Sequence, residues 1–241
     1  MTKTHILVTG ASRGIGKAIL NSFDSDTVRA IGQSTSGETG LLKSDFTSAD
    51  EVTRLWQEAL DRLDGRIDVL INNAGIFIPN PITNSEAEWL ESWNRTLQIN
   101  LTASAQLCRL AVQHFHENGS GGDGGRRIIN IASRAAYRGD GPDHWHYAAS
   151  KGGMVAMTKS IARAYASEEI LAFAICPGFT MTGMAEDYLE SRGGEKLLQD
   201  IPLGRVAQPE EIASIAKYCA LDAPASMTGA ILDANGASFV R

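Results

Sequence analysis

A glycine-rich turn between an apolar segment and a helical segment is the feature that most constrains the fold of this chain. The segment THILVTG, residues 4–10, is short, apolar and rich in β-branched residues, and it ends in glycine. The segment GIGKAILNSF, residues 14–23, follows with helical spacing of its apolar residues. The two segments predict a strand that leads directly into a helix.

The same alternation continues along the chain. Further strand-like runs are TVRAIG, IDVLINNAG, RRIINIAS, ILAFAICPG and GAILDANG, and the helical stretches between them are residues 48–64, 86–117, 146–168 and 209–221. Alternating strands and helices form right-handed βαβ units with a mostly parallel sheet. We therefore expect an α/β fold of the Rossmann type, a doubly wound parallel sheet with helices on both faces, forming a single domain over residues 1–241. The link GQSTSGETGLLKSD is too short for a full crossover helix and is expected to be compact and non-helical.

Composition narrows the class of partner. The 241 residues are 43% hydrophobic, which is enough for a sizeable core, and the net charge is −6. An acidic chain does not suit nucleic acid or an anionic membrane surface, so a small molecule is the expected partner. No apolar run is long enough to span a bilayer, and the first residues do not resemble a signal peptide. We expect a cytoplasmic protein.

The cysteines are few and widely separated. Cys108, Cys176 and Cys219 form no C-x-x-C pair and have no histidine at a zinc-ligand spacing. They are interpreted as buried thiols in a reducing compartment, and no metal site is predicted.

The glycine turn itself has a chemical interpretation. TGASRGIG places Gly10, Gly14 and Gly16 between the first strand and the first helix. Glycine lets backbone N–H groups approach a pyrophosphate, and the helix N-terminus supplies partial positive charge. The spacing differs from G-x-G-x-x-G. A glycine-rich turn without a ligand is the alternative.

Several motifs in a fixed order extend this interpretation. TGASRGIG, NNAG at 72–75, Asn100, Ser133, YAASK at 147–151 and PGFTMT at 177–182 together resemble the short-chain dehydrogenase/reductase family. The resemblance covers nearly the whole chain. The segments VTGASRGIG, YAASKGGM and IPLGRVAQPEEIA are most similar to the 3-oxoacyl-[acyl-carrier-protein] reductase group, although they also occur in sister reductases.

The end of the second strand bears on the choice of nicotinamide cofactor. An NAD enzyme of this fold usually carries an acidic residue there, whereas this chain has Gln33, Ser34 and Thr35. Arg13 resembles the residue that contacts the 2′-phosphate in NADP-preferring relatives, and a guanidinium suits that dianion. NADP(H) is therefore the predicted cofactor, with NAD less favoured. A solvent-exposed arginine at a helix start is the alternative for Arg13.

The resemblance assigns further cofactor contacts. Asp45 resembles the aspartate that accepts a hydrogen bond from the adenine amino group, and a helix cap is its alternative role. Residues 183–206 resemble the substrate lid of the family. The full predicted set of nucleotide-binding residues is Gly10, Ser12, Arg13, Gly14, Ile15, Gly16, Ser34, Thr35, Asp45, Phe46, Asn73, Ala74, Gly75, Tyr147, Lys151, Pro177, Gly178, Thr180 and Thr182.

The predicted catalytic residues are Tyr147, Lys151, Ser133 and Asn100. Tyr147 and Lys151 stand at i and i+4, on one face of a helix. A nearby ammonium favours the phenolate, so Lys151 is expected to lower the pKa of Tyr147, the general acid/base. By resemblance, Ser133 orients the substrate carbonyl, and Asn100 locally disrupts its helix and holds a water that relays protons to Lys151.

The segment between Ser133 and Tyr147 is one residue longer than expected for close reductase relatives. Residues in or next to its loop RGDGPDHW could line the substrate pocket, and exposed loop positions are the preferred interpretation for most of them; they are Arg134, Tyr137, His144, Trp145 and His146. No catalytic histidine is assigned.

These expectations combine into one leading function. The chain is predicted to be an NADP(H)-dependent oxidoreductase that reduces a ketone or a 3-oxoacyl thioester to a secondary alcohol. One alternative is an alcohol or sugar dehydrogenase that works oxidatively with NAD(P). Another is a nicotinamide-sensing binding or regulatory protein, since fold alone does not decide function. Family resemblance also implies a homo-oligomer, either a dimer or a tetramer, packed through the helices at 86–117 and 146–168.

Overall fold

The computed structural model describes residues 3–38, 40–119, 125–182 and 198–241. In this part of the chain seven parallel strands form one sheet in the order β3-β2-β1-β4-β5-β6-β7. This confirms the predicted Rossmann-type sheet. The strands are β1 (Thr4–Val8), β2 (Val28–Ser34), β3 (Leu42–Lys43), β4 (Val69–Asn72), β5 (Arg126–Ile131), β6 (Ile170–Pro177) and β7 (Ile231–Ala234).

The helices lie close to the predicted ranges. They are α1 (Gly14–Ser22), α2 (Ala49–Arg62), α3 (Glu86–Leu97), α4 (Ala103–Glu117), α5 (Ala135–Arg138), α6 (Trp145–Tyr165) and α9 (Pro209–Leu221). The four-residue α5 was not predicted, because so short a segment has no detectable periodicity. The link between β2 and β3 is compact as expected, and β3 has only two residues.

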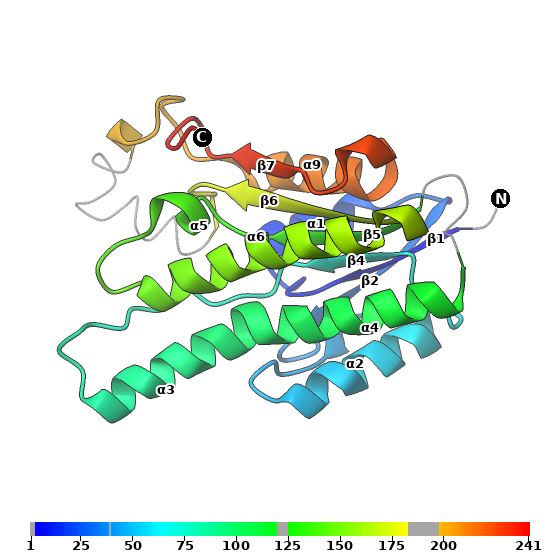
Figure 1. Ribbon diagram of the computed structural model, residues 1–241, viewed down its shortest axis with the longest axis horizontal. Helices are drawn as coiled ribbons and strands as arrows, with labels where there is room; N and C mark the ends of the chain where they lie inside the picture. The colour runs from blue at the N-terminus through cyan, green and yellow to red at the C-terminus, as the bar shows by residue number, and fades with distance from the viewer. Residues whose placement is uncertain (1–2, 39, 120–124, 183–197) are drawn as a thin grey trace.

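Two hydrophobic clusters cover the two faces of the sheet. Neighbouring strand residues alternate between them, with Leu7 in one and Ile6 and Val8 in the other. The first cluster packs under α2, α4 and α6, which Figure 1 shows on one face of the sheet. The second packs under α1 and α9. Burial on both faces explains why strands such as β4 and β6 are almost continuously apolar.

The strand order reverses beside β1, since β2 and β4 lie on its two sides. The segments that follow β1 and β4 therefore pass to opposite faces of the sheet. In open parallel sheets this point forms a crevice where ligands bind. The glycine turn at residues 9–14 and the NNAG segment at 72–75 both lie at this point.

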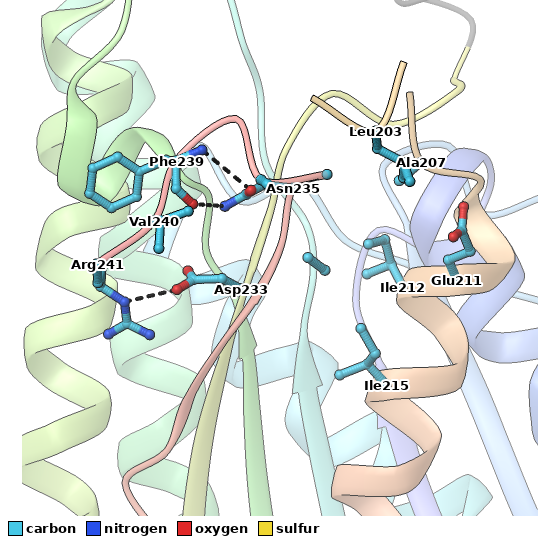
Figure 2. Close-up of a pocket in the computed structure, with 13 residues that line it drawn as sticks. Leu203, Ala207, Glu211, Ile212, Ile215, Asp233, Asn235, Phe239, Val240 and Arg241 are labelled. Carbon is cyan, nitrogen blue, oxygen red and sulfur yellow. Dashed lines mark hydrogen bonds and ion pairs between the residues drawn. The ribbon is translucent and has the colours of Figure 1, made fainter. Parts of the chain in front are cut away.

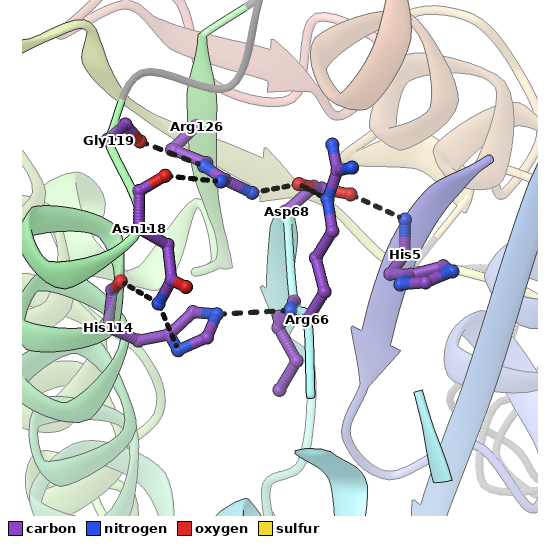
Figure 3. Close-up of polar contacts among 8 residues, drawn as sticks. His5, Arg66, Asp68, His114, Asn118, Gly119 and Arg126 are labelled. Atoms are coloured by element: carbon purple, nitrogen blue, oxygen red, sulfur yellow. Dashed lines mark hydrogen bonds and ion pairs between the residues drawn. The ribbon is translucent and has the colours of Figure 1, made fainter. Parts of the chain in front are cut away.

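The amino ends of the central strands, opposite the crevice, carry a buried ionic cluster (Figure 3). The Asp68 carboxylate accepts hydrogen bonds from the His5 backbone N–H at 2.9 Å and from Arg66 Nε at 2.7 Å, and it also pairs with the Arg126 guanidinium. These contacts connect the starts of β1, β4 and β5. Because Asp68 is only 4% exposed, its charge needs these partners, and the cluster has a structural role.

The cysteines and the membrane prediction can be checked on the described residues. Cys108, Cys176 and Cys219 are buried free thiols, as expected. Burial raises their pKa values, to about 12 for Cys108 and about 11 for the other two. Among the described helices, none has the length and apolar character needed to cross a membrane.

Candidate active site

The glycine turn adopts a backbone that side chains would block. Gly10 has φ of +65°, in the left-handed region that favours glycine. A Cβ on Gly16 would lie 2.0 Å from the carbonyl oxygen of Gly10, so a side chain there is excluded. Helix α1 begins at Gly14 without a side-chain hydrogen bond from its N-cap residue Arg13. Its first N–H groups therefore face the crevice without a side-chain cap, as an anion site requires.

Hydrogen bonds hold this turn against the neighbouring strands. Thr9 Oγ1 accepts from the backbone N–H groups of Asn73 and Ala74, both at 3.0 Å. Asn73 Nδ2 in turn donates to the carbonyl oxygen of Gly10 at 3.0 Å. On the other side, Gln33 Oε1 accepts from the N–H of Gly10 at 2.9 Å. The predicted residues at 10–16 and 73–75 thus form one rigid surface.

The segment after β6 reaches the same surface. A Cβ on Gly14 would lie 2.9 Å from Thr182 Cγ2, which places the Thr182 side chain beside the glycine turn. Thr180 is different, because it is only 7% exposed and its hydroxyl lies 3.3 Å from the carbonyl oxygen of Gly178, within its own turn. Of the two threonines, Thr182 is the better placed for a ligand at the glycine turn.

The end of β2 contains a carboxylate that the sequence did not reveal. Ser34 is 3% exposed, and its hydroxyl donates to Glu38. The chain turns back at Gly37, which has φ of +68° and donates its N–H to Ser34 Oγ at 2.9 Å. The strand end itself has Gln33, Ser34 and Thr35, but the turn brings back the carboxylate of Glu38, four positions after Ser34. Thr35 and Arg13 are exposed beside the crevice.

Asp45 and Phe46 lie between β3 and α2. Asp45 is exposed, and its Oδ1 accepts the N–H of Thr47 at 3.0 Å in a turn before the helix. Phe46 is buried, and its carbonyl oxygen accepts from Gln98 Nε2 at 3.2 Å. The alternative role as a helix cap is wrong, because the N-cap residue of α2 is Ser48 and Asp45 stabilises the turn before it. The contact of Asp45 with adenine stays a prediction.

Tyr147, Lys151 and Ser133 meet at the carboxyl end of β5. The Ser133 side chain is hydrogen-bonded to the Tyr147 phenol. Lys151 Nζ lies 5.8 Å from the centroid of the Tyr147 ring and donates to the carbonyl oxygen of Ile131 at 2.8 Å. Ser133 Oγ also accepts the N–H of Ala135 at 3.1 Å, which fixes the hydroxyl at the start of α5. The predicted serine, tyrosine and lysine therefore occupy one site.

Burial dominates the electrostatics of this pair. Desolvation raises the pKa of Tyr147 to about 12, partly opposed by the hydrogen bond from Ser133. Desolvation also lowers the pKa of Lys151 to about 8. The direction for Tyr147 is opposite to the one expected from a neighbouring ammonium alone, because the phenol is partly buried and Lys151 is buried. A further positive charge in the crevice would favour the ionised phenol.

Asn100 lies in an irregular helical turn. The residues Gln98–Thr102 form a π-helix between α3 and α4, so the helix is disrupted at this point, as expected. Asn100 Oδ1 accepts the N–H of Ile76 at 2.8 Å, and its Nδ2 donates to the carbonyl oxygen of Ile76 at 2.9 Å. A Cβ on Gly75 would lie 3.3 Å from Asn100 Oδ1 and 3.6 Å from Lys151 Nζ. Asn100 thus positions the chain that passes Lys151.

Aromatic side chains line the entrance beside Tyr147. Phe77 stacks on His144 with ring centroids 4.0 Å apart, and it meets the Tyr147 ring edge-to-face at 4.8 Å. Trp145 is 55% exposed, as expected, but it lies on α6 and not in a loop. The interpretation as exposed loop residues is wrong for His146 and Arg134, which are 1% and 6% exposed, because His146 lies on α6 and Arg134 is the N-cap residue of α5.

A second hollow lies apart from this group, between α9 and the C-terminal segment (Figure 2). It has a volume of about 550 Å³. Ile212 and Ile215 line one side, and Asp233, ion-paired with Arg241 at 2.8 Å, lines the other. Its described lining residues do not include the predicted catalytic side chains. A large hollow alone therefore does not identify the site.

The donors and the crevice suit a nicotinamide dinucleotide. Uncapped N–H groups of α1 lie at one end, and a buried ammonium lies at the other, beside Asn100 and Ser133. Among the described residues, no three His, Cys, Asp or Glu side chains gather as metal ligands. Of the predicted lid at 183–206, residues 183–197 lie outside the described part. Residues Ile201 and Val206 pack with Phe179 near the site.

Comparisons with known proteins agree with this geometry. A family model described as Enoyl-(Acyl carrier protein) reductase matches residues 10–236. A 3-oxoacyl-[acyl-carrier-protein] reductase from Synechocystis is 36% identical, with 98% of this chain and 97% of the relative covered. The Escherichia coli 3-oxoacyl-[acyl-carrier-protein] reductase FabG is 31% identical, with 97% and 96% covered.

Solved structures give the same fold. The ligand-free aldohexose dehydrogenase of Thermoplasma acidophilum is similar with a TM-score of 0.84 and 27% identity, covering 100% of this chain and 95% of that one. A short chain dehydrogenase from Burkholderia cenocepacia, in complex with NADP, has a TM-score of 0.87 at 22% identity, with 98% of each chain covered. The second likeness supports the fold alone.

Proposed function

The chain belongs to the short-chain dehydrogenase/reductase family, and on that premise we propose that it is an NADP(H)-dependent reductase of ketones or 3-oxoacyl thioesters. The observation that carries the proposal is the contact of Ser133 with the Tyr147 phenol, one helical turn from a buried Lys151. A protein that only binds a nucleotide has no need for Ser133, Tyr147 and Lys151 together in one site.

The bound dihydronicotinamide would supply a hydride to the carbonyl carbon. Ser133 donates a hydrogen bond to the carbonyl oxygen, where negative charge develops. Tyr147 gives its proton to that oxygen, and the product is a secondary alcohol. Lys151 stabilises the resulting phenolate, and Asn100 holds the Ile76 backbone in place beside the ammonium. Water held by Asn100 would return a proton to Lys151.

The nucleotide is assigned to the crevice at the carboxyl edge of the sheet. Its pyrophosphate would take the first N–H groups of α1, next to the Thr182 side chain beside Gly14. Arg13, exposed at the N-cap of α1, supports NADP because its guanidinium can pair with a 2′-phosphate. We propose that the other predicted nucleotide-binding residues contact the cofactor as the family resemblance implies.

The thioester substrate class rests on the names of the curated relatives, which are 3-oxoacyl-[acyl-carrier-protein] reductases. A second candidate, oxidation of a sugar or alcohol, is favoured by the structural likeness to an aldohexose dehydrogenase. The reaction is reversible, so both candidates use the same side chains. We further propose one domain over residues 1–241, a lid over 183–206, a cytoplasmic location and a homo-oligomer.

An activity panel separates these functions. Purified protein is assayed with 3-oxoacyl thioesters, ketones, aldohexoses and polyols, each with NADP(H) and NAD(H), by nicotinamide absorbance. We expect NADPH-dependent reduction of a 3-oxoacyl thioester with kcat/KM at least about tenfold above that of aldohexose oxidation. The reverse ranking would replace the leading function with the oxidative one. Tight nucleotide binding without any turnover would indicate a sensor.

A further inference from the structure

Glu38 lies four positions after Ser34, one of the predicted nucleotide-binding residues, and is not itself among them. Its carboxylate accepts hydrogen bonds from Ser34 Oγ and from Ser36 Oγ, each at 2.5 Å. Both bonds favour the ionised form and hold the pKa of Glu38 below its ordinary value. The carboxylate is exposed, so it covers the buried Ser34 hydroxyl from the solvent side.

The position of Ser34 places this carboxylate at the nucleotide crevice. Ser34 follows Gln33, whose carbonyl oxygen accepts the N–H of Ala11 at 2.8 Å and whose side chain accepts the N–H of Gly10. Ser34 therefore lies at the carboxyl end of β2, beside the glycine turn. In this fold the ribose of adenosine is bound at that strand end.

The two nicotinamide cofactors present opposite chemistry to such a group. The ribose 2′-hydroxyl of NADH is a hydrogen-bond donor, and a carboxylate accepts from it. The 2′-phosphate of NADPH is close to a dianion, so a carboxylate repels it. The Ser34 hydroxyl, which could donate a hydrogen bond to this phosphate, already donates to Glu38. Arg13 acts in the opposite direction, because its positive charge attracts the phosphate.

We propose that Glu38 is a specificity-determining residue that penalises NADPH relative to NADH by occupying Ser34 and adding negative charge at the 2′ position. This inference rests on the nucleotide site of the proposed function. The protein consequently binds NADPH less tightly than Arg13 and Ser34 would otherwise permit, and NADH is a usable second cofactor.

The test is the ratio of dissociation constants for NADH and NADPH, measured by nucleotide fluorescence at low ionic strength. Glu38→Gln keeps the side-chain length and removes the charge. We expect NADPH to bind about tenfold more tightly and NADH to change by less than about twofold. Glu117→Gln is the matched control, because it removes the same charge from the end of α4, beside the opposite edge of the sheet. It should leave the ratio unchanged.

The outcomes separate the role of Glu38 from the proposed reductase function. An unchanged ratio in Glu38→Gln, or an equal rise in Glu117→Gln, overturns the role of Glu38. The expected ratio change without turnover of any carbonyl substrate supports the role of Glu38 and overturns the proposed reductase. Failure of the unmodified protein to bind either nucleotide overturns both.

Discussion

Replacing Tyr147 with phenylalanine is expected to lower kcat by about 10³-fold, within the range that a positioned general acid contributes. Phenylalanine keeps the ring that meets Phe77 edge-to-face at 4.8 Å, so the local packing is preserved. It removes only the hydroxyl group, which is hydrogen-bonded to Ser133 and donates the proton. The dissociation constant for NADPH should stay within about twofold, since one hydroxyl contact is lost.

The control for this variant is Tyr137→Phe. The Tyr137 hydroxyl accepts from Arg241 at 3.1 Å, so this change also removes one hydrogen-bonded phenol, on α5. Steady-state kinetics and fluorescence titration are measured on both variants. Tyr137→Phe should keep most of the activity. If Tyr147→Phe retains more than about a tenth of the original kcat, Tyr147 is not the proton donor.

Replacing Lys151 with methionine is expected to abolish turnover and, at the same time, to stabilise the ligand-free protein. Lys151 is 4% exposed, and burial lowers its pKa from an ordinary 10.5 to about 8. That difference lowers the free energy of unfolding by about 3 kcal/mol at neutral pH, where the buried amine is protonated. Methionine fills similar space without charge but leaves the Ile131 carbonyl oxygen without its donor. We expect a net gain of about 2 kcal/mol in the free energy of unfolding.

The pH dependence gives this prediction a definite sign. Below pH 8 the lysine is protonated in both states, so the folded state carries the full penalty. Between pH 8 and 10.5 the unfolded chain binds more protons than the folded chain, so this group makes stability rise with pH. The advantage of Lys151→Met over the unmodified protein should therefore be constant below pH 8 and shrink above it.

Urea unfolding at pH 7 and pH 9.5 measures both effects. Lys159→Met is the matched control, since Lys159 lies on the same helix with an exposed side chain. It should change the free energy of unfolding by less than about 0.5 kcal/mol. A Lys151→Met protein that is less stable than the original at pH 7 would show that the Ile131 contact outweighs the burial cost.

The fold was largely predictable because the sheet is covered on both faces. Strand β6 is fully buried, so it appears in the sequence as an uninterrupted apolar run. Helices such as α2 have one apolar face and a clear period. The short α5 was missed because four residues complete only one turn. Its helical form depends on Ser133 and on contacts with the following α6.

The site was predictable where it depends on local spacing. The position of Lys151 beside Tyr147 follows from their i and i+4 positions on α6, and the π-helix at Asn100 agrees with the expected disruption. Properties that depend on an irregular turn or on tertiary contacts were not predictable. Glu38 returns to Ser34 in a turn where Gly37 takes positive φ, and His146 is buried where Trp93 on α3 stacks with it, the ring centroids being 6.4 Å apart.

The raised pKa of Tyr147 is a tertiary effect of the same kind, since burial outweighs the helical neighbour. It has a functional consequence. A phenol with a pKa of about 12 holds its proton firmly in the ligand-free protein. At pH 10, where Lys151 with its pKa of about 8 is largely neutral, positive charge from an oxidised nicotinamide would be needed to ionise it.

The ionisation of the Tyr147 phenol, followed by the Cζ chemical shift of ¹³C-labelled tyrosine with Tyr147→Phe as the assignment control, tests the central claim most directly. At pH 10 the phenol should be protonated in the ligand-free protein, whose pKa is about 12, and ionised in the NADP⁺ complex. A phenol that stays protonated at pH 10 with saturating NADP⁺ would contradict the account, because the site would then lack the means to exchange that proton.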